Sequence, residues 1–69
     1  MSIERNQRGT LREFRHLSGM TLIEASKRLD VAPATLSAWE SGKSFPNVKH
    51  IRKIESLYGV HYDQIIFLV

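Results

Sequence analysis

The sequence predicts an all-α domain, and three observations lead to that prediction. Apolar residues recur at helical spacing, three or four positions apart, through most of the 69 residues. Three of the four glycines come directly after such periodic segments, where glycine commonly ends a helix. No segment shows the alternation of apolar and polar residues that is typical of a half-buried strand. We therefore predict one compact domain of five short helices.

The first helix is predicted from about Gln7 to Ser18, because Leu11, Phe14 and Leu17 follow helical spacing and Gly19 comes next. Residues 1–6 are polar and are expected to form a flexible N-terminus ahead of a domain at residues 7–69.

The stretch from residue 21 to residue 40 is typical of two short helices joined by a tight turn. Thr21 and Glu24 match the S/T-x-x-E capping box that begins a helix. Asp30 is expected in the left-handed conformation that ends that helix, and Pro33 suits the first position of the next. The apolar lining of the pair follows helical spacing and consists of Leu22, Ala25, Ser26, Leu29, Val31, Leu36 and Trp39.

Two further helices complete the prediction. Asn47 is expected to cap a fourth helix that Gly59 ends, with an apolar face formed by Val48, Ile51, Ile54 and Leu57 or Tyr58. A last helix is predicted from about Tyr62, with Tyr62, Ile65, Ile66 and Val69 on one face.

Length and composition limit the classes of function. A chain of this length buries only about 60% of the surface that its unfolded form exposes, which leaves no room for a deep catalytic cleft. It has no cysteine, and its three histidines share no helical pairing or acidic cluster, so we expect no enzyme, metal, cofactor or small-molecule ligand. No apolar run approaches the roughly 20 residues of a membrane span, and the N-terminus lacks the apolar block of a secretory signal, so a cytoplasmic protein is expected. A net charge of +3 favours a polyanionic partner.

From about Gly9 to about Ile66, the sequence resembles the phage Cro/CI-repressor family of helix-turn-helix proteins. The resemblance depends on the spacing of Leu29 and Val31 across the turn, on Thr35-Leu36-Ser37, and on Trp39-Glu40-x-Gly42-Lys43 followed by Pro46. It implies a λ-repressor-like fold whose recognition helix, at about residues 33–41, lies in the major groove of double-stranded DNA.

The resemblance also implies which residues contact bases, namely Pro33, Ala34, Ser37 and Ala38. These residues are smaller than the polar side chains usual in the family. They offer hydroxyls to bases and methyl groups to thymine, but no bidentate hydrogen bond. We therefore expect modest direct readout, with the shape and deformability of the DNA contributing part of the specificity. The alternative is that this surface serves a partner other than DNA.

Phosphate contacts are expected at both ends of the motif. Lys43 and Ser44 follow the recognition helix, and Thr21 and Leu22 begin the preceding helix. The family commonly has a glutamine in place of Leu22, so any contact there would come from backbone amides at the helix start. Weaker candidates are Arg12, Lys27 and Arg28, for which a solvated charge is the alternative.

Arg15 and Glu40 match the positions of a buried ion pair that joins the first helix to the recognition helix in the family. The alternative is two solvated charges. Trp39 is expected in the core rather than as a stacking platform for a base, while Phe45 has no assigned place.

The apolar C-terminal run from Ile65 to Val69 exceeds what one face of a short helix buries. We therefore expect a homodimer to which Tyr58, Phe67 and Leu68 contribute. The alternative is a tail that folds back over the core.

The predicted function is sequence-specific binding of double-stranded DNA at an inverted-repeat operator, by a dimeric repressor of phage or mobile-element type. The alternative is a protein-interaction module, such as an antitoxin-like or adaptor domain, that uses Ile23, Phe67 and Leu68.

Overall fold

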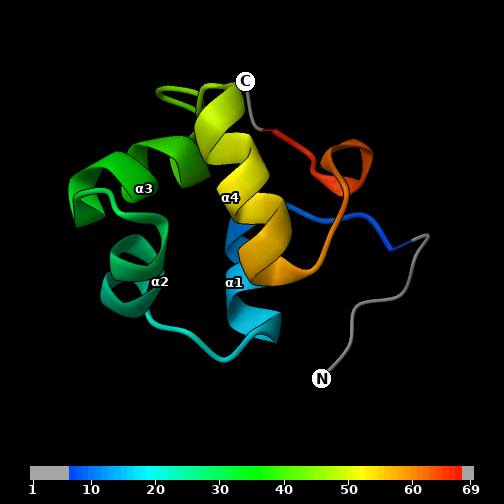
Figure 1. Cartoon of the computed structure of the whole chain (residues 1–69), viewed down its shortest axis with the longest axis horizontal. Helices are drawn as coiled ribbons and strands as arrows, with labels where there is room; N and C mark the ends of the chain where they lie inside the picture. Colours follow the sequence, from blue (N-terminus) through cyan, green and yellow to red (C-terminus); the bar gives the residue numbers. More distant parts are fainter. Residues whose placement is uncertain (1–6, 68–69) are drawn as a thin grey trace.

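The computed structural model describes residues 7–67, and within them the chain forms four α-helices and one short 3-10 helix (Figure 1). The order of the elements is α1 (Leu11–Leu17), α2 (Leu22–Leu29), α3 (Pro33–Ser41), α4 (Val48–Tyr58) and η1 (Tyr62–Gln64). The predicted flexible N-terminus at residues 1–6 and the C-terminal Leu68 and Val69 lie outside the described residues.

Side-chain caps determine where the first two helices begin. The Thr10 hydroxyl accepts the Glu13 amide N–H at 3.2 Å, and the Glu13 carboxylate accepts the Thr10 amide N–H at 2.9 Å. Thr21 and Glu24 form the predicted second capping box in the same way. Because Thr10 is extended, α1 begins at Leu11, four residues later than the sequence pattern predicts.

The turn between α2 and α3 is as tight as the sequence predicts. Asp30 adopts φ +59° and ψ +45°, which confirms the left-handed conformation predicted for it. The amide of Asp30 donates to the Lys27 carbonyl at 3.1 Å, and the amide of Val31 donates to the Ser26 carbonyl at 3.0 Å. These bonds satisfy the last carbonyls of α2, and Pro33 then begins α3 without a side-chain cap from Ala32.

All four helices contribute to one hydrophobic core. Its largest fully buried apolar side chains are Phe14 of α1, Leu29 of α2, Leu36 of α3 and Ile54 of α4. Trp39 is also buried, which confirms its predicted place in the core, and its ring lies 5.2 Å from the His50 ring. Burial of each large apolar side chain stabilises the fold by about 1.5–3 kcal/mol, so this shared core holds α3 firmly against the other helices.

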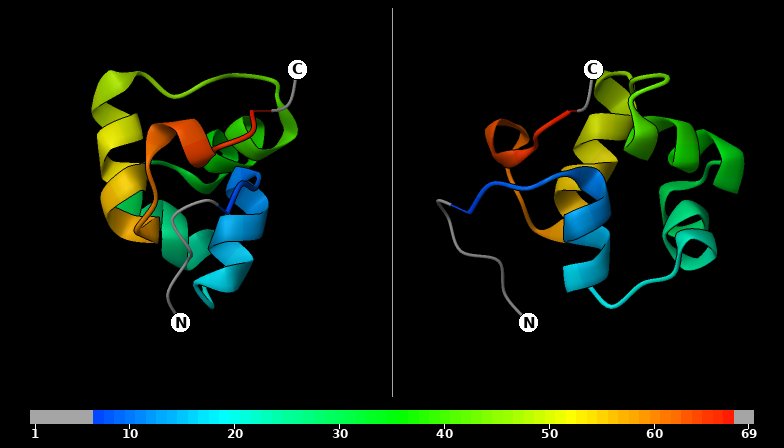
Figure 2. Two further views of the ribbon diagram at one scale, coloured as in Figure 1. Left: turned by 90° about the vertical axis from the view of Figure 1, so that its right-hand side faces the viewer. Right: turned by 180° about the vertical axis from the view of Figure 1, so that it is seen from behind.

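The C-terminal segment differs from the prediction of a fifth α-helix. Up to residue 67, where the described part ends, only the single 3-10 turn η1 forms, and the chain then extends beside the segment that precedes α1 (Figure 2). The Gly9 amide donates to the Gln64 carbonyl at 3.0 Å, and the Ile66 amide donates to the Gly9 carbonyl at 2.8 Å. Extended geometry turns Ile65 into the core and Ile66 outward, whereas the predicted helix placed both on one face.

Candidate DNA interface

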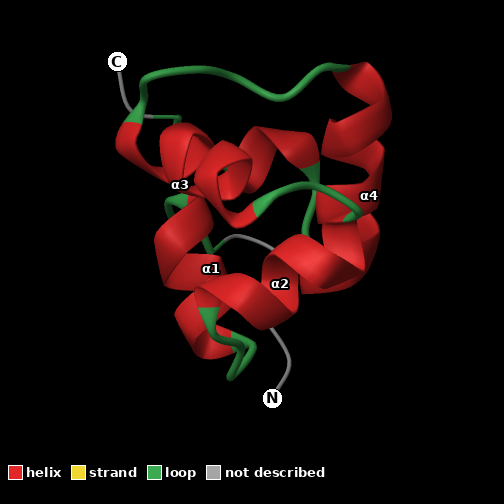
Figure 3. Ribbon diagram, turned by 90° about the vertical axis from the view of Figure 1, so that its left-hand side faces the viewer, coloured by secondary structure: helices red, strands yellow, loops and turns green. Residues whose placement is uncertain are grey.

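The helix-turn-helix exposes one side of α3 to solvent. Figure 3 looks onto α2 and α3, which pack against each other on either side of the turn. Leu36 and Trp39 point into the core, so the opposite side of α3 faces outward. Of the residues predicted to contact bases, Pro33, Ala34 and Ser37 are exposed and Ala38 is half-buried. The structure therefore brings all four to the surface or its edge.

The exposed side of α3 is small and uncharged. Glu40 is the charged residue of this helix, and its carboxylate is engaged by Arg15. The Ser41 hydroxyl donates to the Ala38 carbonyl at 3.2 Å, whereas the Ser37 hydroxyl forms no hydrogen bond within residues 7–67. Ser37 therefore offers a free hydroxyl on a surface that otherwise presents methyl groups and a proline ring.

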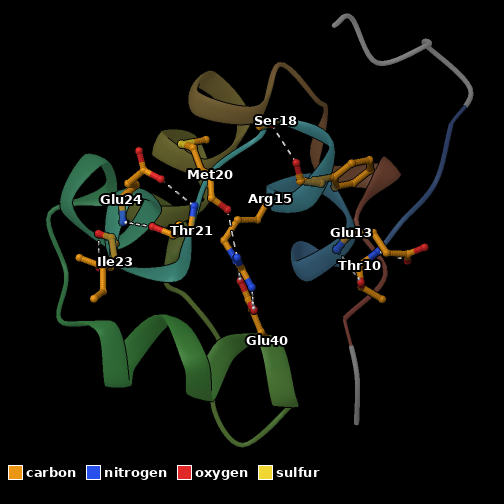
Figure 4. Close-up of polar contacts among 11 residues, drawn as sticks. Thr10, Glu13, Arg15, Ser18, Met20, Thr21, Ile23, Glu24 and Glu40 are labelled. Carbon is orange, nitrogen blue, oxygen red and sulfur yellow. Dashed lines mark hydrogen bonds and ion pairs between the residues drawn. The ribbon is translucent and has the colours of Figure 1, made fainter.

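The predicted pairing of Arg15 with Glu40 is present in the structure as a bidentate ion pair (Figure 4). Arg15 Nε donates to Glu40 Oε2 at 2.7 Å, and Nη2 donates to Oε1 at 3.1 Å. Nη1 donates to the Met20 carbonyl at 3.1 Å, just before α2. The two side chains are 9% and 8% exposed. The guanidinium thus joins α1, α3 and the start of α2, and its hydrogen bond to Glu40 raises the pKa of Arg15 against the opposing effect of burial.

The residues predicted to contact phosphate lie at the two ends of the motif. Thr21 is exposed and Leu22 is half-buried at the start of α2, while Lys43 and Ser44 are exposed in the loop after α3. The Lys43 amide donates to the Ala38 carbonyl at 3.0 Å, which holds this loop against the end of α3. Hydrogen bonds from the backbone and hydroxyl of Thr21 hold the pKa of Glu24 below its ordinary value, so the Thr21 hydroxyl is already engaged.

A surface cavity of about 410 Å³ opens where α1, α2 and α3 meet. Its lining comes from all three helices and consists of Arg12, Arg15, Leu22, Ser37, Glu40 and Ser41. From the sequence, Arg12 is only a weak candidate for phosphate contact, and nothing in the sequence pattern links it with Ser37. Helical spacing does predict that Arg12 lies near Arg15, because the two residues are three positions apart and therefore on the same side of α1.

Tyr58 and Phe67, two of the residues predicted to form a dimer surface, differ in exposure. Tyr58 is only 4% exposed and belongs to the core, so its assignment to a surface contact is wrong for this fold. It points inward because its position on α4 continues the buried face of Ile54. Burial raises the pKa of Tyr58 to about 12, and among the described residues its hydroxyl has no hydrogen-bond partner.

Phe67 keeps a place at the surface, while Leu68 lies outside the described residues. The half-buried Phe67 ring lies 6.0 Å from the ring of Phe45 and 5.9 Å from that of Tyr62. We call Phe45, Tyr62 and Phe67 the aromatic patch. Phe45 and Tyr62 are each 54% exposed, so this patch presents apolar surface to solvent.

None of the helices in the described part of the chain has the length and apolar character needed to cross a membrane. Within residues 7–67, no three or more His, Cys, Asp or Glu side chains gather where they could hold a metal ion.

Comparison with known proteins gives two matches. A family model described as helix-turn-helix matches residues 11–65. The chain is also similar to the HTH-type transcriptional activator BcrR of Enterococcus faecalis, with 29% identity over 56 residues. That match covers 81% of this chain but only 28% of the activator. No solved structure shows significant similarity. Because the family match spans all four helices and the turn that exposes α3, the chain belongs to the helix-turn-helix family of the Cro/C1 type.

Proposed function

We propose that this protein regulates transcription by binding double-stranded DNA sequence-specifically through α3. The observation that carries the proposal is the exposed, uncharged side of α3, held in a fixed orientation by the core and by the Arg15–Glu40 ion pair. The major groove is about 12 Å wide and admits an α-helix. In this arrangement Pro33, Ala34, Ser37 and Ala38 face the base edges, and Ser37 supplies the hydroxyl.

Phosphate contacts on either side of α3 support this orientation. Lys43 and Ser44 are exposed beside the end of α3 and would meet one strand. Thr21 and the backbone of Leu22 begin α2 and would meet phosphate near the opposite end. Such contacts fix the register of a protein on DNA without reading its sequence.

We also propose that the protein acts as a dimer on an inverted-repeat operator. The aromatic patch supports this, because Phe45 and Tyr62 expose apolar rings beside Phe67. Next to the patch is a groove lined by Val48, Ile51, Arg52, Glu55 and Tyr62. The groove carries both a positive and a negative side chain, so a two-fold dimer in which Arg52 of one copy meets Glu55 of the other would be complementary in charge.

Repression by occupation of an operator, of the phage or mobile-element type, is the regulatory mode that we propose. The relative from Enterococcus faecalis is named as an activator, so the direction of control is a separate question. A promoter–reporter fusion carrying the bound site measures it directly. Expression that falls when the protein is supplied supports repression, and expression that rises contradicts it.

The function is tested by selecting a randomised DNA duplex pool with the purified protein and sequencing what is retained. Enrichment of an inverted repeat, with half-sites about one helical turn apart, is the expected result. Ala34→Glu places a carboxylate in the first turn of α3, where it suits the helix dipole but repels DNA. Ser56→Glu, on an exposed position of α4, changes the net charge equally and is the matched control. Retention without enrichment in the wild type contradicts sequence-specific binding.

A protein-binding role is the second candidate, and one observation favours it. The apolar side chain of Ile23 is 60% exposed on α2. DNA binding through α3 does not require an apolar side chain at this place, so the side chain is available to contact a protein. Ile23→Gln should leave DNA selection unchanged. If it abolishes a biological effect while DNA binding persists, a protein partner that contacts α2 is required.

A further inference from the structure

We infer that the cavity where α1, α2 and α3 meet seats one phosphate of the DNA backbone and that Arg12 binds that phosphate. The inference rests on the proposed function, because it identifies a contact within the same interface. The cavity holds about 410 Å³ and opens beside Ser37, on the side of α3 proposed to enter the major groove. A phosphate at this place would lie against all three helices at once.

Apart from Arg12 and Ser37, the polar side chains around the cavity are already engaged. Arg15 uses Nε and Nη2 on Glu40 and Nη1 on the Met20 carbonyl, and both carboxylate oxygens of Glu40 accept from Arg15. Ser41 donates to the Ala38 carbonyl. Leu22 contributes only an apolar side chain. Neither Arg15 nor Glu40 therefore has an unpaired charge with which to attract or repel an incoming anion.

Arg12 is the free cation of this cavity. It is exposed on α1 and forms no ion pair or hydrogen bond within residues 7–67. Because Arg15 and Glu40 neutralise each other, Arg12 leaves the lining with one net positive charge. Its guanidinium offers planar, bidentate donors that match the geometry of phosphate oxygens. Ser37 lines the same cavity, so the phosphate would lie beside the side of α3 that is proposed to face the bases.

The position of Arg12 gives the contact a role in orientation. Arg12 lies on α1, whereas the base-facing residues lie on α3, and the Arg15–Glu40 ion pair joins those two helices rigidly. A phosphate held by Arg12 would therefore fix the distance of α3 from the backbone of one strand. It would strengthen binding to all sequences alike, because phosphate carries no base information.

The test compares Arg12→Gln with Arg8→Gln, which removes the same charge from an exposed position. Arg8 lies in the segment before α1, outside the lining of this cavity, and is the matched control. Affinity is measured over a range of salt concentrations on one duplex of mixed sequence and on the duplex recovered by selection. Arg12→Gln should weaken both by about tenfold at low salt and should reduce the slope of log affinity against log salt by about 0.9 per protomer. Arg8→Gln should leave the slope close to that of the wild type.

Methylphosphonate substitution locates the contact on the DNA. Each phosphate of a half-site is neutralised in turn, and one position should weaken wild-type binding but not binding of Arg12→Gln. Equal effects of Arg12→Gln and Arg8→Gln, or the same substitution pattern for both, would overturn the inference while leaving DNA binding intact. If the wild type binds neither duplex, the proposed function fails as well. Circular dichroism of each variant separates lost binding from lost folding.

Discussion

The ion pair between Arg15 and Glu40 should be essential for the stability of the fold. Replacing Arg15 alone should destabilise the protein far more than replacing both residues together. Both side chains are nearly buried, with 9% and 8% of their surfaces exposed. Arg15→Met removes two charge-assisted hydrogen bonds to Glu40 and one to the Met20 carbonyl. It also leaves a carboxylate without its cation in a position that water hardly reaches. Loss of one partner from such a pair costs about 3–5 kcal/mol.

That magnitude is large for a chain of this size. Domains have unfolding free energies of roughly 0.05–0.15 kcal/mol per residue, so the whole protein is stable by about 3–10 kcal/mol. Arg15→Met alone should therefore remove about half of the stability at the upper end of this range, and it should unfold a large fraction of the protein at 25 °C at the lower end. The double variant Arg15→Met with Glu40→Leu removes both charges, and it should return to within about 1–2 kcal/mol of the wild type.

Urea denaturation measures both effects, followed by circular dichroism and by the fluorescence of the buried Trp39. Glu13→Gln, an exposed carboxylate on α1, is unsuitable as a control because it belongs to a capping box. Asp63→Asn is the suitable control, because that residue is exposed and away from the pair. A loss below about 1 kcal/mol in Arg15→Met would refute the reasoning, since exposed pairs contribute only that much.

Two further predictions concern single residues. The pKa of Tyr58 is about 12 in the fold against an ordinary value of 10. As the pH rises above 10, the unfolded chain therefore loses the phenol proton while the folded protein keeps it. The free energy of unfolding should accordingly fall by about 2 kcal/mol between pH 9 and pH 11.5. In Tyr58→Phe this part of the decline should disappear, and at pH 7 the variant should be no less stable, because the hydroxyl has no partner in the described residues. Asp30→Gly should raise the thermal midpoint by a few degrees, because Asp30 has φ +59° and glycine adopts that conformation without strain. A lower midpoint would mean that the Asp30 side chain stabilises the turn.

The sequence by itself determined the features that depend on neighbouring residues. The capping box of Thr21 and Glu24, the left-handed Asp30 and the start of α3 at Pro33 all agree with the prediction. Each needs only side chains and amides within about four positions, so local chemistry is sufficient. The buried Trp39 followed from helical spacing together with the family resemblance.

Tertiary structure alone decided the features that depend on distant partners. Gln64 donates through Nε2 to the Gln7 carbonyl at 2.7 Å, across 57 positions of sequence. This pairing of the two chain ends replaces the predicted fifth α-helix with an extended segment, because the backbone groups near Gly9 find partners there. Packing of α4 likewise decided between Leu57 and Tyr58, which helical spacing left as alternatives, and buried Tyr58 in the core. The cavity beside Arg12 exists only because three helices meet, and no spacing within one helix reveals where another will lie.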